Sequence, residues 1–338
     1  MSAARSRSGR GVVLALGGGG AAGLAHVGVL QVLAEHDIPV RAIAGTSIGA
    51  EIGAFYARGM SVHDLEALST AIDWKQSLQL FLPDLPTGGL VSGERIVDFL
   101  ARWLGRRRIE RLPIGYVAVA ADLMRGEQVV LDRGDLVQAV RASISLPGVL
   151  APVKIGRRWL VDGGVVNPVP FDVARARFGG PVLAVAVHGG ARHAAPRSGE
   201  LPVPSPQWPR HVQQLLRQPW MARLPALREA LKAQVRSARA REPRSKPYWV
   251  ARRVLDRVLD VAESEIVRLR TELSPPDVML MPRVTGIGGL EFYRAREAID
   301  AGRRAAEERI KEIRALLRWG GRRRAGRGRS AGGRPRSP

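Results

Sequence analysis

The chain has 338 residues, 45% of them apolar, which is enough for one large domain or two small ones. It contains no cysteine, and this excludes disulfides, thiolate metal sites and a cysteine nucleophile. Its formal net charge of +22 would suit a nucleic-acid-binding protein.

The excess positive charge lies outside the expected core. Residues 11–191 and 258–317 are close to neutral, whereas residues 192–257 carry 15 basic and 4 acidic side chains, and residues 318–338 carry 8 arginines and no acid. Such runs are typical of solvated, disordered segments, and otherwise of contacts with a membrane or a nucleic acid. We expect a disordered basic arm at 1–10, a disordered Arg/Gly-rich tail at 318–338 and no specific binding of nucleic acid.

Strands and helices are expected to alternate along the chain. A strand at 11–16 leads through a glycine-rich loop into a helix at about 21–35, and a strand at Arg41–Ala44 leads into a helix that ends near Tyr56. Further helices are expected at 62–71, 93–104, 135–143, 249–272 and 291–317, and further strands at 115–121, 127–131, 153–155, 158–162, 182–187 and 278–281. This alternation predicts an α/β fold with a mostly parallel sheet.

Residues 190–248 interrupt the alternation. They are rich in proline, and Leu224, Leu227 and Leu231 follow helical spacing among basic residues, which predicts a basic, helical insertion within one domain that spans 11–317. The insertion would contact a membrane surface or cover the mouth of an active site. Since no stretch of 18 apolar residues occurs, we expect a cytoplasmic protein, at most peripheral at the inner membrane surface.

The glycine-rich loop reads Gly18-Gly19-Gly20-Ala21-Ala22-Gly23. Glycines let the backbone approach a ligand with its N–H groups, so the loop could hold either a pyrophosphate or the oxyanion of an acyl-transfer intermediate. The dinucleotide fingerprint also requires an acidic residue at the end of the next strand, to bind the ribose. That acid is missing here, which disfavours a dinucleotide.

The next strand ends instead in Gly45-Thr46-Ser47-Ile48-Gly49. G-x-S-x-G between a strand and a helix describes a nucleophile elbow, in which a sharp turn exposes the serine hydroxyl and side chains at the two glycines would collide. The alternative is a serine that caps a helix.

Asp162 follows an apolar strand and precedes Gly163 and Gly164. An aspartate in this position is often a turn residue, but it could also deliver a carboxylate to the edge of the sheet and accept the proton of Ser47. His188 would formally complete a triad in the order of the α/β-hydrolases. Because Ser47 follows only the second strand, a serine–aspartate dyad fits better, and we expect His26 to be a packed or polar-face residue rather than a base.

In order, spacing and context, these three motifs resemble those of the patatin-like phospholipase family, in particular its compact bacterial members. The resemblance covers about residues 11–188 and 250–312, and three further stretches carry it: Arg141-Ala142-Ser143-Ile144-Ser145-Leu146-Pro147-Gly148, Gly163-Gly164-Val165-Val166-Asn167-Pro168-Val169-Pro170 and Gly286-Ile287-Gly288-Gly289-Leu290-Glu291-Phe292. It implies a three-layer fold with helices on both sides of the sheet.

The resemblance also implies a metal-independent serine lipid acyl hydrolase of the phospholipase A, lysophospholipase or esterase type, without a cofactor. Ser47 would be the nucleophile, Asp162 the general base and the loop glycines the oxyanion hole, to which we assign Gly18, Gly19, Gly20 and Gly23. Ala22 departs from the family, which commonly has Arg or Lys there. The alternatives are therefore a hydrolase of soluble esters and a weakly active or inactive member that binds lipid or protein.

Overall fold

The structure, a computed structural model, describes residues 11–71, 93–187, 229, 251–284 and 286–327. Contacts divide the chain into a large unit, Met1–His193 with Asp256–Pro338, and a smaller unit, Ala194–Leu255. The predicted arm at 1–10 and the helix near Leu227 lie outside the described residues. The fold and site below belong to the large unit.

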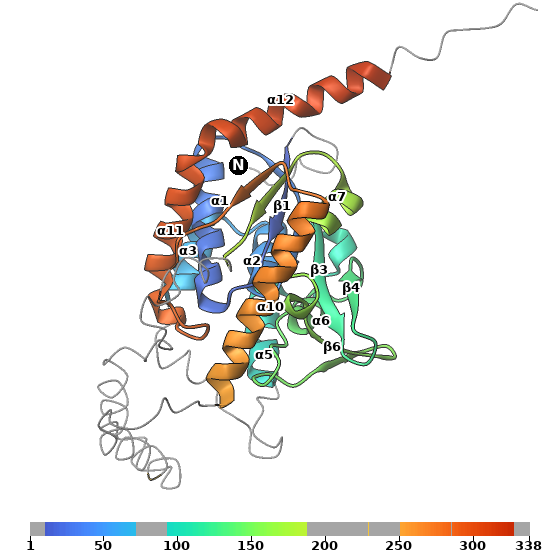
Figure 1. Cartoon of the computed structure of the whole chain (residues 1–338), viewed down its shortest axis with the longest axis vertical. Helices are drawn as coiled ribbons and strands as arrows, with labels where there is room; N and C mark the ends of the chain where they lie inside the picture. The colour runs from blue at the N-terminus through green and yellow to red at the C-terminus, as the bar shows by residue number, and fades with distance from the viewer. Residues whose placement is uncertain (1–10, 72–92, 188–228, 230–250, 285, 328–338) are drawn as a thin grey trace, which may run out of the picture. The chain divides into compact units, whose positions relative to one another are not determined.

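An eight-stranded sheet runs through the large unit in the order β5-β6-β3-β2-β1-β7-β8, with β4 paired to β3 outside this path (Figure 1). The strands are β1 (Val12–Leu16), β2 (Val40–Thr46), β3 (Gly115–Asp122), β4 (Glu127–Leu131), β5 (Val153–Ile155), β6 (Arg158–Asp162), β7 (Val182–Val185) and β8 (Val278–Leu280). The α-helices are α1 (Ala25–Glu35), α2 (Ile48–Ala57), α3 (Val62–Ala71), α5 (Glu94–Leu104), α6 (Leu136–Ser143), α7 (Phe171–Phe178), α10 (Ala251–Leu273), α11 (Ala295–Glu308) and α12 (Ile310–Arg327).

The central strands are parallel, as the alternation of elements predicts. β1 pairs in parallel with β2 and β7, β2 with β3, and β7 with β8, whereas β4, β5 and β6 form antiparallel pairs at one side. Every residue of β1 is buried, because a parallel sheet is covered on both faces. A strand covered on both faces needs apolar side chains throughout, and β1 consists of apolar residues only.

Helices cover both faces of the sheet, which confirms the expected three layers (Figure 1). Alternate side chains of β1 point to opposite faces. Leu14 and Leu16 belong to the core that includes residues of α1, α2 and α11, whereas Val13 and Ala15 belong to a second core with Phe171 of α7 and Val267 of α10.

Helix α7 is not among the predicted elements. It has only eight residues and follows a proline-rich stretch, so it shows little helical periodicity. The local signals were nevertheless present, since Pro170 precedes the first turn, Asp172 lies within it, and Gly179 ends the helix at φ 61°. This short helix supports the face of the sheet opposite α2.

The predicted helix at 291–317 is wrong as a single element. A 3-10 turn, Phe292–Arg294, precedes α11. The helix is interrupted at Arg309, and α12 begins at the next residue. Neither glycine nor proline marks this position, at which the Arg309 side chain donates to the carbonyl of Met279 at 2.7 Å. The backbone of α12 continues to Arg327, so residues 318–327 are helical rather than disordered, consistent with the helix propensity of arginine.

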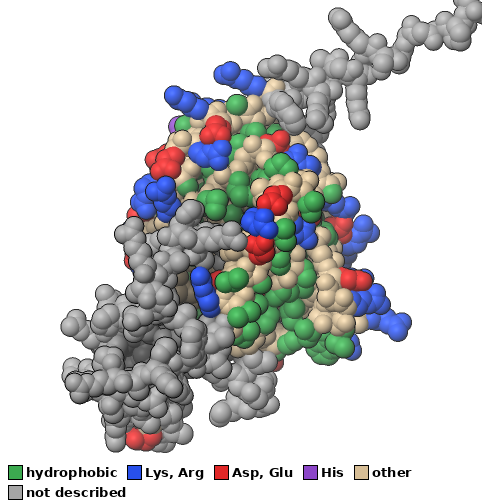
Figure 2. Space-filling model, viewed as in Figure 1, with side chains coloured by type: hydrophobic (Ala, Val, Ile, Leu, Met, Phe, Trp, Pro, Cys, Tyr) green, Lys and Arg blue, Asp and Glu red, His purple; other side chains and the backbone are tan. Residues whose placement is uncertain are grey.

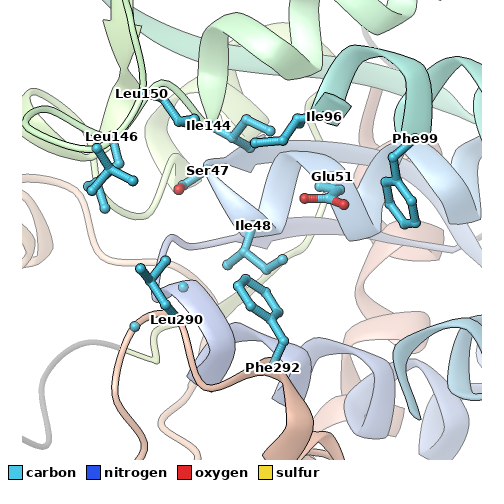
Figure 3. Close-up of a pocket in the computed structure, with 13 residues that line it drawn as sticks. Ser47, Ile48, Glu51, Ile96, Phe99, Ile144, Leu146, Leu150, Leu290 and Phe292 are labelled. Carbon is cyan, nitrogen blue, oxygen red and sulfur yellow. The ribbon is translucent and has the colours of Figure 1, made fainter. Parts of the chain in front are cut away.

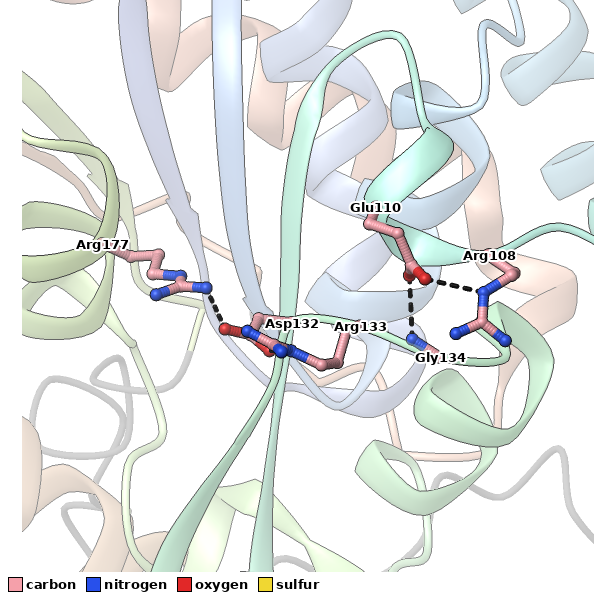
Figure 4. A network of polar contacts seen from close by, with 6 residues as sticks. All are labelled: Arg108, Glu110, Asp132, Arg133, Gly134 and Arg177. Atoms are coloured by element: carbon pink, nitrogen blue, oxygen red, sulfur yellow. Dashed lines mark hydrogen bonds and ion pairs between the residues drawn. The ribbon is translucent and has the colours of Figure 1, made fainter.

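A surface network ties together the loops at the far end of β4 (Figure 4). Glu110 accepts hydrogen bonds from the Gly134 N–H at 2.9 Å and from Arg108 Nε at 2.6 Å. Hydrogen bonds with the backbone and with Arg108 lower the pKa of Glu110 to about 2. Arg177 of α7 pairs with Asp132 beside Arg133, so this network links α7 to the end of β4.

Among the residues that the structure describes, no helix combines the length and apolarity needed to cross a bilayer.

Candidate active site

Ser47 lies at the sharp turn from β2 into α2. Its backbone has φ 56° and ψ −129°, and among the described residues only Asp37 is another non-glycine with positive φ. A Cβ on Gly45 would lie 2.5 Å from the carbonyl oxygen of Gly49, and a Cβ on Gly49 would overlap the backbone of Leu16 and Gly17. The turn therefore requires glycine on both sides of Ser47, and it projects the serine hydroxyl from the end of the sheet.

Asp162 ends β6 and is 3% exposed. Ser47 Oγ donates a hydrogen bond directly to Asp162 Oδ2 at 2.5 Å, without an intervening imidazole. Asp162 Oδ1 accepts the Gly164 N–H at 2.8 Å, which fixes the rotation of the carboxylate. Gly163 packs against the carbonyl of Val119, where a side chain would collide. The structure thus brings together two predicted residues that are 115 positions apart.

The last turn of α6 and the residues after it contact both Ser47 and Asp162. Ser143 Oγ accepts the Ser47 N–H at 3.0 Å and donates to the Val119 carbonyl at 2.6 Å, while the Ser145 carbonyl accepts the Asp162 N–H at 2.9 Å. The buried Arg141 donates to Ser145 Oγ at 2.6 Å. The site predicted from the sequence did not include these contacts. In the sequence, these residues belong to the stretch Arg141–Gly148, which contributed to the family resemblance but was not assigned to the site.

The glycine-rich loop forms a 3-10 turn, Gly20–Leu24, before α1. Gly18 donates its N–H to the Pro168 carbonyl at 3.0 Å, so in this structure that amide is already bonded. Gly23 packs against Ile48, where a Cβ would overlap the isoleucine side chain. Among the described residues, the N–H groups of Gly19 and Gly20 have no acceptor, and Gly20 also lines the pocket beside Ser47.

Two contacts fix this loop in place. Ala21 donates its N–H to the carbonyl of Gly289 at 2.9 Å, so the late stretch 286–292 supports the loop from outside. His26 is fully buried, and its Nε2 bonds the carbonyl of Gly17 at 2.8 Å. His26 therefore holds the backbone of the loop, as expected for a packed residue. His188 lies outside the described residues.

An apolar pocket opens beside the Ser47 hydroxyl (Figure 3). Its lining comes from the glycine-rich loop, the elbow with α2, α5, the stretch after α6 and residues 289–292: Gly20, Ser47, Ile48, Glu51, Ile96, Phe99, Ile144, Leu146, Val149, Leu150, Gly289, Leu290 and Phe292. Aliphatic and aromatic walls of this kind suit a hydrocarbon chain.

Glu51 is the acidic exception in that lining. It lies one helical turn after Ser47, and Figure 3 shows its carboxylate in the cavity near Phe99. Burial raises the pKa of Glu51 to about 7. Pattern reasoning did not single out this residue, because a glutamate in the first turn of a helix is ordinary in sequence.

Within the described part of the chain, no group of three or more His, Asp or Glu side chains is placed to hold a metal ion.

Comparisons with known proteins found similar chains. A family model described as Patatin-like phospholipase matches residues 14–175. An NTE family protein of Mycobacterium bovis is 31% identical over 331 residues, covering 88% of this chain and 91% of that protein. The rat patatin-like phospholipase domain-containing protein 7 is 39% identical over 191 residues, covering 54% of this chain but 14% of its own length. The crystal structure of VipD from Legionella pneumophila covers 91% of this chain and 67% of its own, at 13% identity and a TM-score of 0.42.

Proposed function

Because the chain belongs to the patatin-like phospholipase family, we propose that it cleaves lipid acyl esters with Ser47 as nucleophile and Asp162 as general base. Membership of the family implies lipid acyl hydrolase activity. The observation that supports the roles of Ser47 and Asp162 is the 2.5 Å hydrogen bond from Ser47 Oγ to Asp162 Oδ2 beside the apolar pocket.

The proposed reaction is a two-step acyl transfer. Asp162 accepts the Ser47 proton as Oγ attacks the ester carbonyl, and the alcohol leaves with that proton. Water then gives a proton to Asp162 and attacks the acyl-enzyme, which releases the fatty acid and restores Ser47. The N–H groups of Gly19 and Gly20 would donate to the oxyanion, which usually contributes a large part of the rate enhancement. The apolar pocket would hold the acyl chain.

The experiment that tests this function combines turnover and covalent labelling. The full chain should release p-nitrophenol from short and medium acyl esters in the presence of EDTA. A fluorophosphonate probe should modify Ser47, identified by peptide mass spectrometry. Labelling without turnover would reject the substrate class and keep the nucleophile, whereas turnover that EDTA abolishes would reject the metal-independent reaction.

A silent, unlabelled protein would favour the alternative function. That alternative is supported by Ala22, which occupies the loop position where the family commonly has Arg or Lys. In that case the apolar pocket would bind lipid without cleaving it.

We also propose that the protein contacts membranes, through the basic segment 192–257 and the two termini. These segments lie mostly outside the described residues, but the ends of two neighbouring hairpins support such a contact. Leu123 and Met124, between β3 and β4, are 53% and 77% exposed, and Trp159 of β6 is 44% exposed. The Leu123 N–H donates to the Trp159 carbonyl at 2.8 Å, so the two hairpins are joined.

Exposed basic residues surround these apolar side chains. They are Arg125, Lys154 and Arg157, and Lys154 lies over the Trp159 ring at 5.6 Å. Figure 2 shows hydrophobic and basic side chains next to each other over this part of the surface. β3 extends three residues beyond Val119, which pairs with the last residue of β2, so these hairpin ends lie at the same edge of the sheet as Ser47. Tryptophan with lysine and arginine is a combination suited to an anionic lipid interface.

Vesicle sedimentation tests this contact. We expect the protein to sediment with phosphatidylglycerol-containing vesicles more than with pure phosphatidylcholine, and the double variant Met124→Glu/Trp159→Glu to sediment less. The control is Leu273→Glu, because Leu273 is 86% exposed on α10. If the double variant sediments like the unmodified protein, the hairpins play no part, and any contact depends on the basic segments alone.

A further inference from the structure

Glu51 is a half-buried carboxyl group that the proposed mechanism does not use. It lines the same pocket as Ser47, together with nine hydrophobic side chains, and Figure 3 shows its carboxylate lying in the cavity. An ionisable group in an apolar wall costs folding free energy unless it is hydrogen-bonded. An apolar residue would line the pocket without that cost.

Within the described part of the chain, no protein group is bonded to this carboxylate. The Glu51 backbone N–H bonds the Ser47 carbonyl at 3.1 Å, but its carboxylate accepts no hydrogen bond from any described residue. Desolvation is the cause that raises its pKa to about 7, and among the described residues no cation stabilises the charged form. The nearby Tyr116 hydroxyl donates to the Ala50 carbonyl instead, at 2.8 Å. The carboxylate lines the open pocket and is therefore available to a partner that arrives with the substrate.

The position of Glu51 limits what that partner can be. Residues four apart share one face of a helix, with Cβ atoms about 5–6 Å apart, so an acyl chain bound at Ser47 would pass Glu51 a few carbons beyond the carbonyl. The aliphatic walls disfavour an ammonium group, which would lose its hydration without replacement. A hydroxyl needs only one acceptor, and Glu51 provides it.

We propose that Glu51 forms a polar subsite that selects acyl chains carrying a hydroxyl group a few carbons from the ester carbonyl. This inference rests on the proposed function, because it assumes that the acyl chain enters the pocket beside Ser47. It names the substrate class of that site: hydroxylated acyl esters in preference to plain ones of equal length.

The test compares p-nitrophenyl hexanoate with its 3-hydroxy and 6-hydroxy analogues. In the unmodified protein, kcat/KM for one of the hydroxylated esters should exceed that for the plain ester by roughly tenfold, as expected for one added hydrogen bond to a carboxyl group. Glu51→Leu should remove the preference and raise turnover of the plain ester, while Glu51→Gln should keep part of the preference. The exposed Glu308→Leu is the matched control and should change nothing.

A second measurement does not require catalysis. Binding of 3-hydroxyhexanoic or 6-hydroxyhexanoic acid should raise the Tm of the unmodified protein more than hexanoic acid does, and Glu51→Leu should lose the difference. If this difference is present in a protein that neither turns over esters nor reacts with the fluorophosphonate, the subsite stands and the hydrolase proposal fails. Equal treatment of plain and hydroxylated ligands by the unmodified protein, or a preference that survives in Glu51→Leu, overturns the subsite.

Discussion

Replacing Ser47 with alanine is expected to lower ester hydrolysis by roughly 10,000-fold or more and to abolish labelling by the fluorophosphonate. The hydroxyl that bonds Asp162 at 2.5 Å is the only atom group removed, so the pocket and the glycine-rich loop remain. Steady-state release of p-nitrophenol, with intact mass after labelling, measures both effects. A variant that retained turnover would place the reaction at another residue.

The matched variant Ser47→Gly separates chemistry from backbone strain. Both substitutions remove the hydroxyl, but only glycine accepts φ 56° with ψ −129° at little cost. We expect both variants to be inactive and the glycine variant to be more stable by about 1 kcal/mol in urea unfolding. Equal stabilities would mean that the elbow stores no strain at Ser47.

Replacing Asp162 with asparagine is expected to lower kcat/KM by roughly 100- to 10,000-fold, the range that general-base catalysis provides. Asparagine can still accept the Gly164 N–H with its oxygen, so the turn after β6 should persist. Its amide would then present a donor to Ser47 Oγ where the carboxylate presents an acceptor. Since Ser47 is intact but no longer activated, labelling should slow without being abolished, which distinguishes this variant from Ser47→Ala.

Asp122→Asn provides the control for the loss of a buried carboxylate. Asp122 ends β3, is 2% exposed and likewise bonds backbone N–H groups of the following turn, at Met124 and Arg125. We expect this variant to change stability and to leave kcat/KM within about twofold. If Asp122→Asn and Asp162→Asn lose activity equally, the effect comes from the fold rather than from a base.

Much of the fold could be predicted because its signals are local. β1 is a short apolar run bounded by glycine, and the elbow around Ser47 needs glycine at fixed positions, so each is visible in a few residues. The break at Arg309 has no such signal, since neither glycine nor proline stands there, and the side chain of Arg309 contacts Met279, 30 positions earlier.

In the candidate site, too, some residues could be predicted from local sequence and others could not. Ser47 and Asp162 could be identified from their own turns, because each turn has a sequence requirement of its own. The roles of Ser143 and Ser145 could not, because they consist of hydrogen bonds to residues that only the folded sheet brings close. Glu51 was missed for a different reason: the pocket that makes its charge unusual is assembled from five separate segments.

The support of the glycine-rich loop has a consequence for protein synthesis. Ala21 is bonded to Gly289, and α1 packs against α11 where Gly28 and Gly302 let the two backbones meet. The ribosome makes these supporting residues more than 260 positions after the loop itself. A nascent chain therefore carries Ser47 and Asp162 before the loop can be fixed in place. If the loop forms the oxyanion hole as proposed, we expect ester cleavage only from chains long enough to include residue 289 and α11.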